Sequence, residues 1–168
     1  MPALANSGSP GVDVFLSVKS KRAGAIKGES QAAEHKDAIV VQGWSWGVAA
    51  SSAIGSTQAT GRRSYRNLVV HKRVDCATTA LISVLATNDE VKEAKLSLRK
   101  AGEGQRDYFT ITLINARVTG VDLECDDQGQ TSERVTFTFN KVQIDYDVQA
   151  GSGQRGAGYS FQDEILPS

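Results

Sequence analysis

Several residue types that mark special classes of protein are scarce in this sequence. Its 168 residues include only 3 prolines, 2 cysteines and 2 histidines, and 19 basic side chains balance 19 acidic ones. With 40% hydrophobic and 23% charged residues, the composition excludes a wholly disordered or collagen-like chain. The zero net charge argues against broad binding to nucleic acid or to an anionic membrane, since both require a basic excess.

Long hydrophobic runs are also missing. The longest are short, as in Val12–Leu16, whereas a membrane-spanning helix needs about 20 apolar residues. Residues 1–11 lack the basic and apolar regions of a signal peptide. We therefore expect no membrane insertion, and a protein that stays in the cytoplasm or leaves it without a cleavable signal. In a reducing cytoplasm, Cys76 and Cys125 are expected to be free thiols.

The dominant local pattern is that of β-strands. Segments rich in β-branched and aromatic residues predict strands at Val12–Val18, Ile39–Val48, Asn67–Lys72, Ala94–Arg99, Tyr108–Val118 and Arg134–Val148. In 94–99 the alternation places Leu96 and its apolar neighbours inward and Lys95, Ser97 and Arg99 outward. In 134–148 the apolar positions change parity, which predicts a β-bulge or bend near Asn140-Lys141.

One amphipathic helix is predicted over Cys76–Thr87. Asp75 precedes it and can cap its free N–H groups. Ala77, Leu81 and Leu85 recur four residues apart, with Ile82 beside them, and form an apolar stripe. Together these elements predict a mainly β fold, a β-barrel-like pair of packed sheets with one flanking α-helix.

The length predicts one domain over residues 1–168. Two parts of it, residues 1–11 and the Gly-rich segment 150–158, are expected to be flexible, with a short strand around Tyr159–Phe161. Residues 49–66 form an extended loop rich in small residues, and such long loops are usually functional. We expect this loop to order against a partner.

No motif in the sequence predicts catalysis. The GxGxxG spacing of Gly151–Gly156 lacks the helix that dinucleotide binding requires. His35, His71 and the two cysteines do not have zinc-ligand spacing. No nucleophile elbow or P-loop is present. The sequence therefore predicts a non-enzyme with no catalytic residue, no cofactor and no metal.

Two groups of residues are candidates for contacts. Trp44 and Trp46 share one face of a strand and suit a core layer, a subunit contact or a ligand platform. Arg62, Arg63 and Arg66 end the long loop and can pair with acidic residues of a neighbouring molecule.

A set of motifs in a fixed order carries a family resemblance. They are Gly28-Glu29-Ser30 followed by His35, Gly43–Gly47, Leu68–Lys72 leading to Asp75 and the helix, Ala94–Gly102, Tyr108–Leu113, Glu133–Lys141 and Asp145-Tyr146. Spread over Val12 to Phe161, this set resembles the Hcp (haemolysin-coregulated protein) family, the tube proteins of the bacterial type VI secretion system.

The resemblance implies a β-barrel-like fold and a role in assembly. Members form hexameric rings that stack into a hollow tube, which leaves the cell with a VgrG-type spike at its tip. A contractile sheath surrounds the tube, and small effector proteins travel in its lumen. Gly28, Glu29 and Ser30 are the candidates for residues that face this lumen. Some members carry a C-terminal toxin extension, and because this sequence ends at Ser168, the expectation from the resemblance is a structural and export role without catalysis.

Two alternatives stay open at this point. One is a phage-like tail tube protein of another contractile machine. The other is a monomeric β-barrel module that binds a small ligand or carbohydrate, with Trp44 and Trp46 as its platform.

Overall fold

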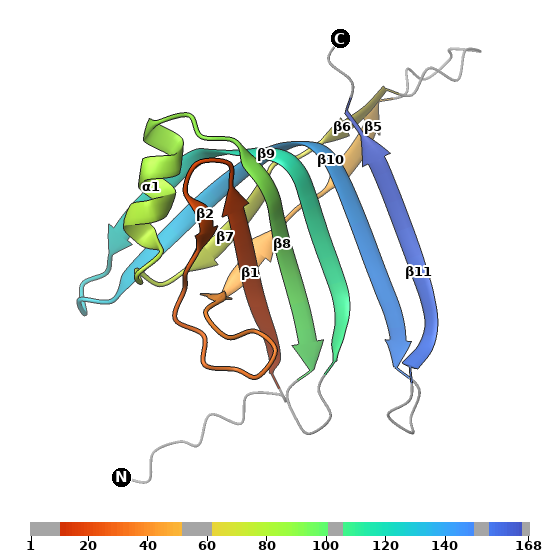
Figure 1. Ribbon diagram of the computed structural model, residues 1–168, viewed down its shortest axis with the longest axis horizontal. Helices are drawn as coiled ribbons and strands as arrows, with labels where there is room; N and C mark the ends of the chain where they lie inside the picture. Colours follow the sequence, from red (N-terminus) through yellow and green to blue (C-terminus); the bar gives the residue numbers. More distant parts are fainter. Residues whose placement is uncertain (1–10, 52–61, 101–105, 150–154, 166–168) are drawn as a thin grey trace, which may run out of the picture.

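The computed structural model describes residues 11–51, 62–100, 106–149 and 155–165, and it is dominated by strands (Figure 1). The elements, in chain order, are β1 (Val12–Ser20), β2 (Gly24–Ile26), β3 (Ile39–Val41), β4 (Gly43–Ser45), β5 (Val48–Ser51), β6 (Arg62–Tyr65), β7 (Leu68–Lys72), α1 (Thr78–Ala86), β8 (Val91–Lys100), β9 (Asp107–Cys125), β10 (Thr131–Gln149) and β11 (Arg155–Glu164). This confirms the expectation of a mainly β fold with one flanking helix.

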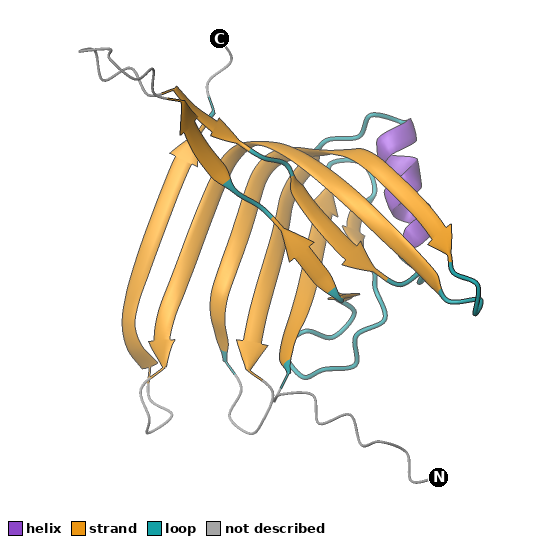
Figure 2. Cartoon of the chain, turned by 180° about the vertical axis from the view of Figure 1, so that it is seen from behind, coloured by secondary structure: helices purple, strands orange, loops and turns teal. Residues whose placement is uncertain are grey.

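Nine strands form one strongly curved sheet. Its order is β2-β1-β8-β9-β10-β7-β4, with β11 also paired to β10 and β3 also paired to β1. The short strands β5 and β6 pair only with each other. Figure 2 shows from behind that shorter strands run diagonally across the long ones, which gives the fold two layers.

The segment Ile39–Ser45 joins the two ends of this sheet. Its first part, β3, pairs with β1, and its second part, β4, pairs with β7. At the crossing between them, the Gln42 N–H donates to the His71 carbonyl over 2.8 Å. The barrel-like closure predicted from the sequence therefore rests on one short segment that changes partners.

The long strand β10 also changes partners along its length. Residues 133–137 pair with β7 and residues 141–149 pair with β11, while β9 lies on the other side throughout. The predicted change of face lies at Asn140, between buried Phe139 and buried Val142. Asn115 of β9, at φ 51°, lies opposite this interruption, and the register is the same on both sides of it. Because both strands change face together, the irregularity is a shared bend, and the register shift lies elsewhere, between Thr136 and Phe137.

The core lies between the two layers and beneath α1. Its fully buried members include residues of β1, β7, β8, β9 and β10: Leu16, Leu68, Leu96, Ile111, Leu113 and Phe137. From α1, Leu81 and Val84 face this core, whereas Ile82, which was expected in the apolar stripe, is 40% exposed. The helix starts at Thr78, two residues later than predicted. Just before it, Asp75 Oδ1 accepts a hydrogen bond from the Ala77 N–H.

Three further expectations need correction. Ser97 and Arg99 of β8 lie on the outward face as expected, but they are buried there because residues 27–38 fold over that face of the sheet. The extended loop 49–66 contains the paired strands β5 and β6 at its ends, and its middle, 52–61, lies outside the described residues. Of the segment expected to be flexible, residues 155–158 belong to β11, whereas 150–154, like residues 1–10, lie outside the described residues.

Within the part of the chain that the structure describes, no helix is long and apolar enough to cross a membrane. The same residues contain no cluster of three or more His, Cys, Asp and Glu side chains suited to a metal ion. Cys76 and Cys125 are both exposed free thiols.

Candidate subunit interface

The two tryptophans are directed into the molecule. Trp44, half-buried on β4, stacks on Phe109 with ring centroids 6.1 Å apart. Trp46 stacks on Tyr65 at 5.8 Å, and Tyr65 in turn meets the edge of Phe139. These contacts join both rings to the core, so the pair does not form the exposed platform that a carbohydrate-binding module would use.

The three arginines do not act as one group. Arg63 of β6 forms a two-pronged ion pair with Asp163 of β11, and the Nη2–Oδ1 distance is 3.1 Å. Arg62 is exposed, and exposed Arg66 lies against Gly47. The structure therefore leaves Arg62 and Arg66 available for contacts, while Arg63 already binds within the chain.

The Asp163 carboxylate connects the short hairpin β5–β6 to the long sheet. It accepts hydrogen bonds from the Arg63 guanidinium and from the Tyr65 hydroxyl. These bonds, with that from Arg63 the stronger, hold the pKa of Asp163 below its usual value. Burial, reinforced by the contact with Asp163, raises the pKa of Tyr65. The carboxylate stays charged at neutral pH and fixes the base of the hairpin.

Gly28, Glu29 and Ser30 begin a tight loop that continues to Ala38. A Cβ on Gly28 would lie 2.4 Å from the Ala38 carbonyl oxygen, so only glycine fits there. The Gly28 N–H donates a hydrogen bond to the backbone carbonyl of Asp37 over 2.7 Å, and the Ser30 N–H donates one to the backbone carbonyl of Ala38 over 3.0 Å. Gly28 and Ser30 are buried, and Glu29 is the exposed member of the motif.

This loop is held against the sheet by a group of aromatic and charged side chains. His35 stacks on Phe15 with centroids 4.4 Å apart, and its Nε2 lies 2.7 Å from Asp107 Oδ1. The Arg99 guanidinium lies over the same Phe15 ring at 4.9 Å and donates to the Ala33 carbonyl. These contacts explain why Phe15 and Arg99, on the face opposite the core, are buried.

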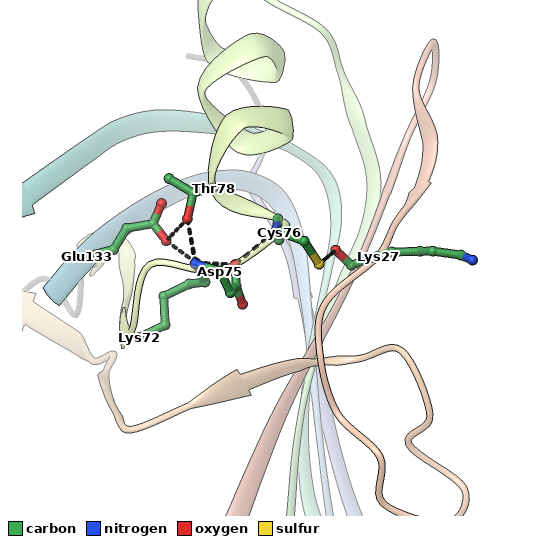
Figure 3. Close-up of polar contacts among 7 residues, drawn as sticks. Lys27, Lys72, Asp75, Cys76, Thr78 and Glu133 are labelled. Carbon is green, nitrogen blue, oxygen red and sulfur yellow. Dashed lines mark hydrogen bonds and ion pairs between the residues drawn. The ribbon is translucent and has the colours of Figure 1, made fainter. Parts of the chain in front are cut away.

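A second polar cluster lies largely inside the fold, where β7, β10 and the start of α1 meet (Figure 3). The Lys72 ammonium, fully buried, contacts Glu133 Oε2, Asp75 Oδ1 at 2.8 Å and Thr78 Oγ1 at 3.3 Å. Thr78 Oγ1 also lies 3.3 Å from Glu133 Oε2. Because each of the charges has an oppositely charged partner, the cluster ties the start of the helix to two strands.

Sequence reasoning missed this cluster, although a signal for it was present. Lys72 follows Leu68 and Val70 on the buried face of β7, and Glu133 precedes Val135 and Phe137 on the buried face of β10. Opposite charges that continue two adjacent apolar faces indicate a buried pair, provided that the two strands are known to be neighbours.

The outer edge of β11 is open in the part of the chain that the structure describes. This ten-residue strand pairs only with β10. On the side that continues the core face, Tyr159 is 63% exposed, Phe161 49% and Tyr146 43%. An open edge flanked by exposed aromatic rings is typical of a surface that another molecule covers.

Comparison with known proteins assigns the family. Residues 15–146 match the family model described as "Type VI secretion system effector, Hcp". The chain is 32% identical over 151 residues to "Protein hcp1" of Pseudomonas aeruginosa, covering 88% of this chain and 90% of that protein. This chain belongs to the Hcp family. It is thus a type VI secretion protein, and the resemblance inferred from the sequence motifs is confirmed.

Other relatives agree with this assignment. The "Major exported protein" of the same species is 26% identical and covers 71% of this chain and 74% of its own length. A type VI secretion system effector from Yersinia pestis has a TM-score of 0.72 at 27% identity, covering 91% of this Hcp chain and 100% of its own. Hcp1 from Salmonella typhimurium has a TM-score of 0.70 at 26% identity, covering 92% and 94%.

Proposed function

We propose that this Hcp chain is the structural subunit of a type VI secretion tube. Six copies form a ring, and rings stack into a hollow tube that leaves the cell with a VgrG-type spike, driven by a contractile sheath. Small effector proteins travel in the lumen. The observation that carries this proposal is the family match, which spans residues 15–146 and so includes nearly every strand of the folded domain.

The assembly state tests this proposal directly. Light scattering coupled to size exclusion is expected to give a mass six times the 17.9 kDa of the chain, and electron microscopy is expected to show rings with a central opening. A mass near that of one chain at all attainable concentrations would exclude a tube subunit. That result would favour the monomeric ligand-binding module.

We assign the contact between rings to the hairpin β5–β6. It pairs with no other strand among the described residues, and its outer arginine, Arg62, is exposed. Trp46 stacks on Tyr65 of β6, and Arg63 and Tyr65 bind Asp163 of β11, so the base of the hairpin is fixed to the long sheet. Deleting residues 51–60 is expected to abolish ring stacking or ring formation, and unchanged assembly would refute this role.

For the lumen, the exposed position of Glu29 supports only one member of the Gly28-Glu29-Ser30 motif as a wall residue. Glu29→Cys in a variant that lacks Cys76 and Cys125 is expected to react with a small maleimide in assembled tubes. It is expected to resist a maleimide coupled to a polymer too large to enter the tube. Equal reaction with both reagents would place Glu29 on the outside.

Export follows from this role without catalysis by the chain itself. Before firing, the protein resides in the cytoplasm, and afterwards in the medium or a target cell. The relative described as a major exported protein supports this route. The protein is expected in the culture supernatant of its host and absent from it when the sheath gene is deleted. Export that continues without the sheath would contradict the proposal.

A further inference from the structure

The hairpin β5–β6 is the far half of a longer two-stranded ribbon, whose near half is formed by β4 and β7. In the near half, the last pair is Ser45 with Val69. In the far half, the first pair is Val48 with Tyr65. Two residues of one strand and three of the other lie between these pairs, so one strand carries an extra residue. Such an extra residue interrupts the ladder and bends it.

The far half receives little support from the ribbon itself. A backbone hydrogen bond from the Arg66 N–H to the Gly47 carbonyl, over 2.8 Å, crosses the interruption, and Trp46 stacks on Tyr65. Beyond it, β5 and β6 pair only with each other in the described part of the chain. A single two-stranded hairpin is at best marginally stable in water. The ladder alone therefore fixes neither the direction nor the stability of the far half.

The Asp163 carboxylate of β11 ties the far half to the long sheet. Arg63 and Tyr65 lie two residues apart, so they share one face of β6, and both donate to this carboxylate. Asp163 lies opposite buried Val142 in the register with β10. Figure 1 shows β5 and β6 beside the end of β11. Exposed ion pairs contribute little as a rule, but a two-pronged arginine pair within a network is among the exceptions.

We propose that Asp163 is the anchor that holds the hairpin β5–β6 in the direction in which it meets the next ring. This rests on the tube proposed above, in which the hairpin carries the contact between rings, and it names the residue that positions the hairpin. With Asp163 bound, the hairpin projects as one piece with the long sheet. Without it, the hairpin turns about the interruption at Trp46-Gly47. Each contact between rings must then first order the hairpin, which weakens stacking.

Hydrogen exchange measures the anchor within one chain. Asp163→Asn keeps the shape of the side chain and removes its charge, and Asp163→Ala removes both acceptor oxygens. Backbone amides of β5 and β6 are expected to exchange at least about tenfold faster in both variants, while those of β1 and β8 keep their rates. Glu164→Gln is the matched control, since Glu164 is the adjacent carboxylate and lies on the opposite face of β11. It is expected to leave all rates unchanged.

A double-mutant cycle tests the direct partner of Asp163. Arg63→Gln alone is expected to speed the exchange of the hairpin amides as well. Combined with Asp163→Asn, it is expected to add little, because the guanidinium then has no carboxylate to bind. Fully additive effects would show that the two side chains act separately, and they would overturn the anchor.

Assembly tests the role of the anchor in the tube. Rings of both Asp163 variants are expected to keep the mass of the unaltered rings in light scattering. Sedimentation over a dilution series gives the protein concentration at which half of the rings are stacked. This concentration is expected to rise at least about tenfold in both variants and to stay unchanged in Glu164→Gln.

The outcomes separate the anchor from the tube. Unchanged hairpin exchange in both Asp163 variants would overturn the anchor and leave the tube standing. Faster exchange with unchanged stacking would also overturn it, since the hairpin would then need no fixed direction to join rings. A one-chain mass for the unaltered protein would overturn the tube, and with it the role of Asp163 in stacking.

Discussion

Removing the buried ammonium of Lys72 is expected to destabilise the protein more than most single substitutions. Lys72→Met keeps most of the side-chain volume but leaves two carboxylates, Glu133 with no exposed side-chain surface and Asp75 with 9%, without their cation. Breaking a buried ion pair by deleting one partner costs about 3–5 kcal/mol. For a chain of this length, that corresponds to a fall in melting temperature of about 6–20 °C.

The assay is urea unfolding at one fixed protein concentration, because assembly would otherwise change the apparent stability. Lys95→Met, at an exposed position of β8, is the control and is expected to change the free energy of unfolding by less than about 0.5 kcal/mol. Lys72→Met with Glu133→Leu is expected to recover part of the loss, since the more deeply buried of the two uncompensated carboxylates is gone and only Asp75 remains. A loss below about 1 kcal/mol for Lys72→Met alone would refute the account of this cluster.

The remaining predictions concern two other local features. Gly28→Ala is expected to lower the free energy of unfolding by more than about 2 kcal/mol because its Cβ would overlap the Ala38 carbonyl; thermal melting against Gly43→Ala, where the nearest atom is 4.0 Å away, checks it. The buried Asp89 carboxylate is desolvated, but hydrogen bonds from Ser20 and from backbone N–H groups of the β1–β2 turn hold its pKa below the usual value. Its stabilisation is therefore present at neutral pH and lost as the pH falls from about 4 through the folded-state pKa. Asp89→Asn is expected to cost about 1–2 kcal/mol at pH 7 and less at pH 3, and an equal loss at both pH values in urea unfolding would contradict this.

Strand faces were predictable where one side of a strand meets the core and the other meets solvent. The alternation of β8 correctly placed Ala94, Leu96 and Leu98 inward, because side chains of a strand point to opposite faces in turn. It also placed Ser97 and Arg99 on the outer face, but it did not reveal their burial, because residues 27–38, far away in the chain, cover that face. Periodicity reports the face on which a side chain lies but not what covers that face.

Loop and helix boundaries were less predictable. The hairpin β5–β6 was predicted as an extended loop because its strands are short. Small residues make up most of β5 and two arginines half of β6, so their sequence has little strand signal. Ile82 was placed on the apolar stripe of α1, yet the stripe that meets the core contains Leu81 and Val84 instead. A short helix presents several apolar residues, and its packing partner selects which of them are buried.

The sequence by itself determined the long strands β1, β8, β9 and β10, the single helix, the change of face at Asn140 and the Hcp family, because these depend on local periodicity and on motifs in a fixed order. Only the tertiary structure decided that β10 changes partner from β7 to β11 and that Lys72 and Glu133 meet in the interior. The reason is physical: charge balance and alternation are properties of a chain, whereas a partner across a sheet is set by register between residues distant in sequence.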